Sequence, residues 1–152
     1  MQPYDERLTA PRTWWLLAAG AGVALGLMLL PLGPVAALAG VVAGAVLSAV
    51  GVSVYGSARV RVVADSLVAG DARIPLTALG EARALDAAEA RAWRSHKADP
   101  RAHMLLRGYI ATAVRVEVTD PEDPTPYVYL STRQPERLVA ALAAAGAPGR
   151  AA

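Results

Sequence analysis

The sequence contains no cysteine among its 152 residues. Disulfide bonds, thiolate metal ligands and a cysteine nucleophile are therefore excluded. Charge is also sparse, since Asp, Glu, Lys and Arg make up 18% of the chain while hydrophobic residues make up 55%. No charged residue occurs between Arg12 and Arg59. An uncharged stretch of this length has room for two membrane-spanning helices, so an ordinary soluble domain is not expected.

A strong excess of positive charge is also lacking. The chain has 15 basic and 13 acidic residues and a formal net charge of +2. Domains that bind nucleic acids neutralise phosphates with a clear excess of lysine and arginine. The sequence therefore predicts no nucleic-acid partner.

Two apolar runs, residues 11–30 and residues 35–55, occupy the uncharged stretch. At a rise of about 1.5 Å per residue, each is long enough to cross a hydrocarbon layer roughly 30 Å thick. Thr9 is expected to cap the first helix, with Pro11 in its first turn. The Pro-Leu-Gly-Pro segment at residues 31–34 predicts a break and a tight turn. The pattern therefore predicts a transmembrane helical hairpin.

The positive charges that flank this hairpin predict its orientation. Arg7 and Arg12 precede the first span, Arg59 and Arg61 follow the second, and the turn has none. By the positive-inside rule, the chain is a multi-pass protein of the cell (plasma) membrane with both termini in the cytoplasm. Two arginines after the second span fall short of the about four to eight basic residues that strong anionic-lipid recognition takes. The residues expected at the membrane surface are Trp14, Trp15, Tyr55, Arg59 and Arg61.

A secreted product is the alternative to the hairpin. Ala37-Leu38-Ala39 has the small-x-small form of a signal-peptidase site after an apolar stretch. Cleavage there would leave a long apolar segment at the new N-terminus, which argues against this alternative.

Glycines recur at helical spacing in both spans. Gly22 and Gly26 lie four residues apart in the first span, and Gly40 and Gly44 match them in the second. Small residues at this spacing let helix backbones approach closely in lipid. The two stripes are expected to pack on each other, although the same surface would also serve a homodimer.

Residues 59–146 have the pattern of an α+β domain. Alternation of polar and apolar residues predicts strands at residues 59–62, 67–69, 72–74, 82–85, 110–118 and 128–130. Helices are predicted at residues 86–97, where Asp86 and Glu89 resemble a capping box, and at residues 134–145, an amphipathic helix ended by Gly146. The predicted architecture is thus an N-terminal segment and transmembrane hairpin in residues 1–58, a small antiparallel β domain with a C-terminal amphipathic helix in residues 59–146, and a flexible tail at residues 147–152.

Residues capable of catalysis or metal binding are few. His96 and His103 have Asp99 between them, but this spacing matches no standard metal-ligand pattern. Ser95, His96 and Asp99 are too close in sequence to form a nucleophile–base–orienter triad. We therefore predict no catalytic, cofactor or metal site, no bound cofactor and no enzymatic activity.

An acidic, proline-rich run spans residues 120–127, Asp-Pro-Glu-Asp-Pro-Thr-Pro-Tyr. Three prolines stiffen the backbone and remove hydrogen-bond donors, so this loop cannot readily add strands. It is either a rigid hairpin tip, a preorganised surface for docking a partner, or a cation site. Arg101, Arg107 and Arg133 either pair with nearby carboxylates or face an anionic ligand. The candidate partner-binding residues are Asp120, Glu122, Asp123, Tyr127 and Arg133.

Several short motifs carry a resemblance to a known family. They are Tyr4-Asp5-Glu6-Arg7-Leu8, Ala72-Arg73-Ile74-Pro75, Asp99-Pro100-Arg101-Ala102, Asp123-Pro124-Thr125-Pro126-Tyr127 and Ser131-Thr132-Arg133. From residue 4 to about residue 146 the chain resembles the actinobacterial membrane-protein family known as domain of unknown function 3093. Val128 and Gly108 stand where that family often has an aromatic residue and a proline, which weakens the case for an aromatic docking platform. A weaker resemblance, of fold only, is to bacterial pleckstrin-homology-like domains tethered by a helical hairpin.

These observations predict a membrane-anchored, non-enzymatic interaction, scaffold or accessory protein. Its expected partners are the lipid bilayer and another membrane or cytoplasmic protein, and a homo-oligomer is left open. The alternative is an enzyme, or a sensor of a small ligand or lipid, with its site in the cytoplasmic domain. A polar pocket containing His103, Arg107 and Arg133 would favour that alternative.

Overall fold

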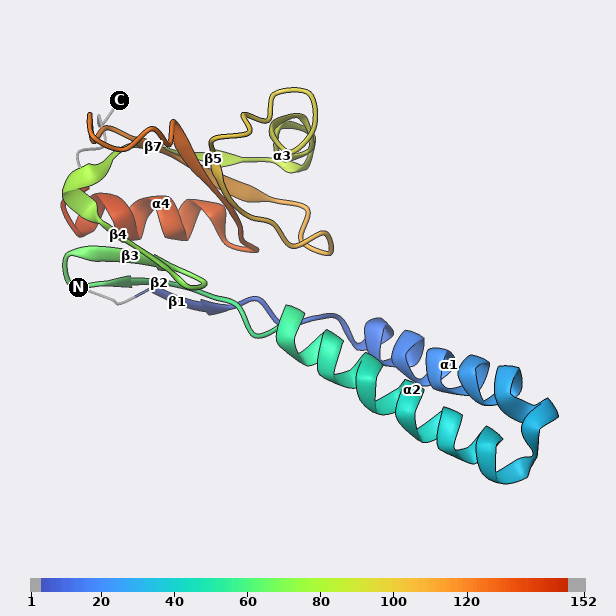
Figure 1. Ribbon diagram of the computed structural model, residues 1–152. Coiled ribbons are helices and arrows are strands. Elements are labelled where there is room, and N and C mark those ends of the chain that lie inside the picture. Colours follow the sequence, from blue (N-terminus) through green and yellow to red (C-terminus); the bar gives the residue numbers. More distant parts are fainter. Residues whose placement is uncertain (1–3, 148–152) are drawn as a thin grey trace. The chain divides into compact units, whose positions relative to one another are not determined.

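The structure is a computed structural model that describes residues 4–147 (Figure 1). The chain divides into a helical unit, Thr9–Ala58, and a β-sheet unit, which in the described part of the chain comprises residues 4–8 and 59–147. Residues 4–8 belong to the β-sheet unit, and Tyr4–Arg7 pair with a strand that follows the hairpin. Of the predicted tail, only Ala147 lies within the described residues, and it is buried.

The helical unit consists of α1 (Arg12–Leu29), a 3₁₀ turn η1 (Leu30–Leu32) and α2 (Pro34–Tyr55). Both helices are long and apolar enough to cross a membrane. Gly33 links them with φ of +115°, a conformation that residues with a side chain rarely adopt. The predicted cap at Thr9 is wrong: α1 begins at Arg12, with Pro11 in the capping position and no side-chain capping bond.

The first sheet has four antiparallel strands in the order β1-β2-β3-β4. They are β1 (Tyr4–Arg7), β2 (Arg59–Val63), β3 (Ser66–Ala69) and β4 (Ala72–Pro75). Because β1 pairs with β2, the helical unit is inserted in the sequence between two neighbouring strands of one sheet. One face of this sheet is buried, and its core side chains are Tyr4, Glu6, Val60, Val62 and Leu67.

The second sheet has the order β5-β7-β8-β6. Its strands are β5 (Leu79–Leu85), β6 (His103–Leu105), β7 (Ala113–Val118) and β8 (Tyr127–Ser131), and a 3₁₀ turn η2 (Leu76–Ala78) joins β4 to β5. The prediction of a wholly antiparallel domain is wrong here, because β6 pairs with β8 in parallel. The strand predicted at residues 110–118 begins only at Ala113, since Ile110 N–H bonds to the Arg107 carbonyl in a turn.

Two helices pack on this second sheet. The C-terminal helix α4 (Pro135–Ala144) contacts β1, β5 and β7, so it lies between the two sheets, with Leu138 and Leu142 buried (Figure 1). The helix α3 (Ala87–Trp93) ends four residues earlier than predicted. Asp86 Oδ1 accepts hydrogen bonds from the backbone N–H groups of Ala88 and Glu89, as the predicted cap requires. The Glu89 side chain pairs with Arg83 at 2.6 Å.

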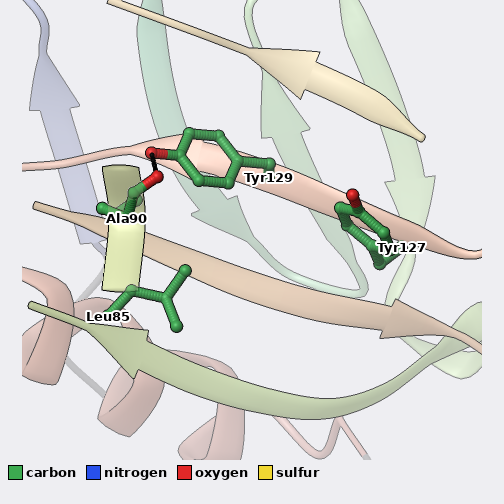
Figure 2. Close-up of a cluster of buried hydrophobic side chains, with 5 residues drawn as sticks. Leu85, Ala90, Tyr127 and Tyr129 are labelled. Atoms are coloured by element: carbon green, nitrogen blue, oxygen red, sulfur yellow. Dashed lines mark hydrogen bonds between the residues drawn. The ribbon is translucent and has the colours of Figure 1, made fainter. Parts of the chain in front are cut away.

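Both faces of the second sheet are covered. On one face, the core cluster contains Leu85, Ala90, Tyr127 and Tyr129, and the Tyr129 hydroxyl donates a hydrogen bond to the Ala90 carbonyl at 3.2 Å (Figure 2). The opposite face buries Val114, Val116, Val128 and Leu130. The central strand β8 is consequently buried along its whole length.

Candidate functional site

The acidic loop, residues 119–126, connects β7 to β8 and is largely exposed. Asp120 Oδ1 accepts a hydrogen bond from Glu122 N–H at 3.0 Å, and Asp123 Oδ1 accepts one from Thr125 N–H at 2.9 Å. The bonds from Thr125 hold the pKa of Asp123 below its usual value, so this carboxylate keeps its charge to lower pH. The three carboxylates thus lie exposed in the loop of an antiparallel hairpin.

Backbone hydrogen bonds fix both ends of the acidic loop. Thr119 N–H bonds to the Ala78 carbonyl at 2.8 Å, and Val118 N–H bonds to the Pro126 carbonyl at 3.2 Å. Together with the prolines, these bonds restrict the backbone before any partner arrives. The loop therefore presents three carboxylates on a preformed frame.

Tyr127 lies at the end of this loop, but its side chain is directed into the core. Only 4% of it is exposed. Its hydroxyl accepts a hydrogen bond from Asp99 N–H at 2.9 Å, and its ring meets Trp93 edge-on, with the ring centroids 5.3 Å apart. Tyr127 therefore holds the segment after α3 in place and offers little surface to a partner.

Arg115 extends this aromatic contact and was not foreseen in the sequence. Its guanidinium lies 4.5 Å from the Trp93 ring centroid and 5.1 Å from that of Tyr127, and it pairs with Glu117 at 3.2 Å. The alternating pattern of β7 placed Arg115 on a polar face, which α3 and Trp93 in fact cover. The signal available in the sequence was Trp93, the one tryptophan outside the apolar runs.

Arg133, the remaining predicted partner-binding residue, is not brought together with the acidic loop. It follows the opposite end of β8, beyond Ser131. Its exposed side chain lies 5.9 Å from the Tyr109 ring, and its backbone N–H donates a hydrogen bond to Glu6 Oε1 at 3.0 Å. The five predicted residues therefore do not form one site: the three loop carboxylates share a surface, whereas Tyr127 and Arg133 belong to separate surroundings.

A buried polar cluster surrounds Glu6, and sequence reasoning missed it. We call Tyr4, Glu6, Thr132 and the backbone N–H of Arg133 the Glu6 cluster. Glu6 is 8% exposed and its Oε2 accepts hydrogen bonds from the Tyr4 hydroxyl, at 2.6 Å, and from the Thr132 hydroxyl. Burial, and then the hydrogen bond with Glu6, raises the pKa of Tyr4. The cluster unites the opening motif of the chain with the Ser131-Thr132-Arg133 motif.

The polar pocket that would favour an enzyme or a sensor is not formed at the cavity that His103 lines. Asp99 pairs with Arg101 at 3.1 Å, which is one of the internal pairings expected. A small cavity of about 140 Å³ has His103 and Asp123 in its lining, together with Ala72, Ile74, Val118, Thr125 and Val128. Arg107 and Arg133 do not line this cavity, which is smaller than the roughly 300 Å³ of typical ligand pockets. Within residues 4–147, no group of three or more His, Asp or Glu side chains could hold a metal ion.

The glycines predicted to pack the helices do meet within one chain. Gly22, Gly26, Gly40 and Gly44 are all buried. A methyl group added to Gly44 would lie 2.9 Å from the Gly22 Cα, and one added to Gly22 would lie 2.8 Å from the Val41 carbonyl oxygen. The backbones of α1 and α2 therefore touch at these positions.

The aromatic residues expected at the membrane surface lie at one end of this helix pair. Trp14 near the start of α1 stacks on Tyr55 at the end of α2, with ring centroids 5.6 Å apart and planes within 2°. Trp15 beside them is 47% exposed. Amphipathic aromatic side chains in this position are typical of a membrane–water interface.

Together these features define an α+β protein in which two long apolar helices are inserted between the first two strands of an antiparallel sheet. The chain belongs to the family of proteins of unknown function DUF3093, whose family model matches residues 3–142. No protein of curated function and no solved structure shows significant similarity to it. The pleckstrin-homology-like fold therefore remains a prediction.

Proposed function

We propose that this protein is a membrane-anchored, non-enzymatic interaction protein that binds a partner protein through its acidic loop. The supporting observation is the combination of exposure and rigidity in residues 119–126. Asp120 and Asp123 each fix the loop backbone, and none of the three ion pairs within residues 4–147 uses a carboxylate of this loop. A charged loop that is rigid before binding loses little conformational entropy when a partner docks.

The chemistry of the loop defines the partner. Three carboxylates at a hairpin tip complement a basic surface, and such complementarity gives specificity and fast association more than raw affinity. The partner is therefore a membrane or cytoplasmic protein with a basic docking surface, reached while the chain is anchored by α1 and α2.

The triple variant Asp120→Asn, Glu122→Gln, Asp123→Asn tests this proposal in the full-length protein. Exposed charges contribute little to stability, so the variant should accumulate normally. Crosslinked pull-down from native membranes should then lose the proteins captured by the unaltered chain. A matched control removes three other exposed carboxylates of the β-sheet unit: Asp65→Asn, Asp71→Asn and Glu81→Gln. An unchanged set of captured proteins would show that the acidic loop is a rigid cap, and a triple variant that does not accumulate would assign its carboxylates to folding.

The proposed anchoring places both termini in the cytoplasm. Reporter fusions at Gly33 and at the C-terminus test this orientation. The reporter at Gly33 should behave as exported and that at the C-terminus as cytoplasmic, because Arg7, Arg12 and Arg59 flank the apolar helices. An exported signal from the C-terminal fusion would refute the orientation.

A further inference from the structure

The outer face of the first sheet gathers four arginines from three strands. Antiparallel pairing sets Arg7 opposite Arg59, while Arg61 and Arg73 both lie opposite Val68, one from each side. Residues paired directly across antiparallel strands project on the same side of a sheet. We call Arg7, Arg59, Arg61 and Arg73 the arginine face.

Within residues 4–147, the positive charge of this face is only partly neutralised. Asp5, opposite Arg61, is the one carboxylate in the strands on this side. None of the three ion pairs between described residues involves an arginine of this face. Arg73 Nε donates a hydrogen bond to the Ser66 hydroxyl at 3.0 Å, whereas the buried Arg61 Nε has no hydrogen-bond partner within residues 4–147. A buried guanidinium N–H without an acceptor fits a face that receives oxygen atoms from an anionic ligand.

The short connections between these strands and the apolar helices favour lipid headgroups as the ligand. Arg7 precedes the first residue of α1, Arg12, by five positions, and Arg59 follows Tyr55, the last residue of α2, by four. At no more than about 3.6 Å per residue, these connectors reach at most roughly 18 Å and 14 Å. A face tethered so closely to spanning helices meets lipid headgroups at high local concentration. Guanidinium groups bind phosphate oxygens through two parallel hydrogen bonds.

We propose that the arginine face binds the headgroups of anionic phospholipids in the membrane that anchors the chain. This inference rests on the membrane anchoring of the proposed function and does not depend on the acidic loop. Arg59 and Arg61 alone were too few for lipid recognition, but the sheet register adds Arg7 and Arg73. The four together reach the lower end of the about four to eight basic residues that such recognition takes.

The absence of cysteine allows a direct test with the full-length protein. Val63→Cys, which replaces a 43% exposed side chain on the same side of β2, carries a fluorophore. The labelled chain is reconstituted, at one chain per nanodisc, in phosphatidylcholine alone or with phosphatidylglycerol, each containing a spin-labelled quencher lipid. A second label at Ala88→Cys, exposed at the start of α3, is the control position. Nanodiscs are open on both sides, so an altered membrane orientation of a variant does not affect the reading.

Quenching at Val63→Cys should be several-fold stronger in the anionic discs, while quenching at Ala88→Cys should not change with lipid. Each arginine at an anionic surface strengthens association by about fivefold. Replacing all four arginines of the face with glutamine should abolish the lipid dependence, and replacing them with lysine should retain most of it. The matched control, with Arg91, Arg94, Arg101 and Arg137 changed to glutamine, should behave as the unaltered chain. High salt should also weaken the effect, because the Debye length falls from about 10 Å at 0.1 M to about 3 Å at 1 M.

Equal quenching in neutral and anionic discs would overturn the assignment. Quenching that depends on the number of chains per disc would also overturn it, since the face would then bind a second copy. If the glutamine variant does not fold, the salt series and the lysine variant still decide the question. A chain that does not enter nanodiscs at all would refute the membrane anchoring itself, whereas one that enters them without lipid dependence would refute this inference alone.

Discussion

Glu6 in β1 accepts a hydrogen bond from the backbone N–H of Arg133, at 3.0 Å, although the two residues lie 127 positions apart. The same carboxylate accepts from the Tyr4 and Thr132 hydroxyls. Thr132 Oγ1 also accepts from Gln134 N–H at 3.0 Å, directly before α4. These hydrogen bonds link β1, the strand that precedes the helical unit, to the residues just before α4. A buried carboxylate with three donors holds this arrangement, because without it the Arg133 N–H and one of the two hydroxyls would lose their acceptor.

Replacement of Glu6 should show how much these hydrogen bonds stabilise the fold. Glu6→Ala removes the acceptor of three donors. The Tyr4 and Thr132 hydroxyls, 2.9 Å apart, can still bond to each other, so one hydroxyl and the Arg133 N–H lose their acceptor, and the free energy of unfolding should fall by about 3 kcal/mol. Glu6→Gln should cost less, about 1 kcal/mol, because the two hydroxyls can turn to accept from the amide. Thermal unfolding of the detergent-purified chain, followed by circular dichroism, measures both effects. The neighbouring exposed Asp5→Ala is the control, and a Glu6→Ala variant as stable as this control would show that the cluster does not stabilise the fold.

Because the pKa of Tyr4 is raised, the stability that the Glu6 cluster gives to the fold depends on pH. Burial and the Glu6 carboxylate raise this pKa above the ordinary value of 10.0, so the folded chain holds the phenolic proton more tightly than the unfolded chain does. The corresponding stability is complete below about pH 10 and is lost as the pH rises above it. Tyr4→Phe should therefore lower the melting temperature at pH 8 and flatten its decline between about pH 10 and pH 11.

Tyr129 should also contribute to the loss of stability at high pH. Burial raises its pKa as well, so some decline should remain in Tyr4→Phe and should shrink further in the double variant with Tyr129→Phe. Parallel melting curves for the unaltered chain and Tyr4→Phe across this pH range would contradict the assignment.

Local patterns predicted most of the secondary structure. The alternation in β2 and β7, the Asp86 cap and the Gly146 stop each depend on residues within one turn or strand. Gly146 ends α4 with φ of +87°, and Ala147 N–H bonds to the Leu142 carbonyl as in a Schellman motif. By contrast, β1 could not be recognised, because three of its four residues are charged and Glu6 finds its donors far away in sequence. The parallel pairing of β6 with β8 is likewise a long-range feature.

The same distinction applies to the candidate sites. The acidic loop was predicted because its prolines and carboxylates act on neighbouring residues. The burial of Tyr127 was not predicted, since it depends on Trp93 and on the segment near Asp99. The arginine face depends on the register of β4 against β3, which the local sequence does not determine.

Arg115 should contribute more to stability than a surface arginine does. Its side chain is 20% exposed and lies over Trp93, whereas that of Arg83, directly across the strand pair, is 60% exposed. Arg115→Ala removes both packing and cation–π contact, which should cost about 2 kcal/mol, while Arg83→Ala should cost less than about 0.5 kcal/mol. Denaturant or thermal unfolding of the two variants makes the comparison. Similar losses would show that Arg115 contributes only as an exposed ion pair.

The glycines of α1 and α2 provide the last prediction, which concerns the helical unit alone. The double variant Gly22→Leu, Gly44→Leu places bulky side chains where the two backbones touch, so the helix pair should separate. The matched control is Gly20→Leu, Gly51→Leu, because an added methyl group at either position meets nothing within 4 Å. Both pairs gain the same helix propensity, so the comparison isolates the packing between helices. The first variant should melt at a lower temperature in detergent than the second, and the control should melt at or above the temperature of the unaltered chain. Equal melting of the two variants would mean that contact between the glycines does not stabilise the helix pair.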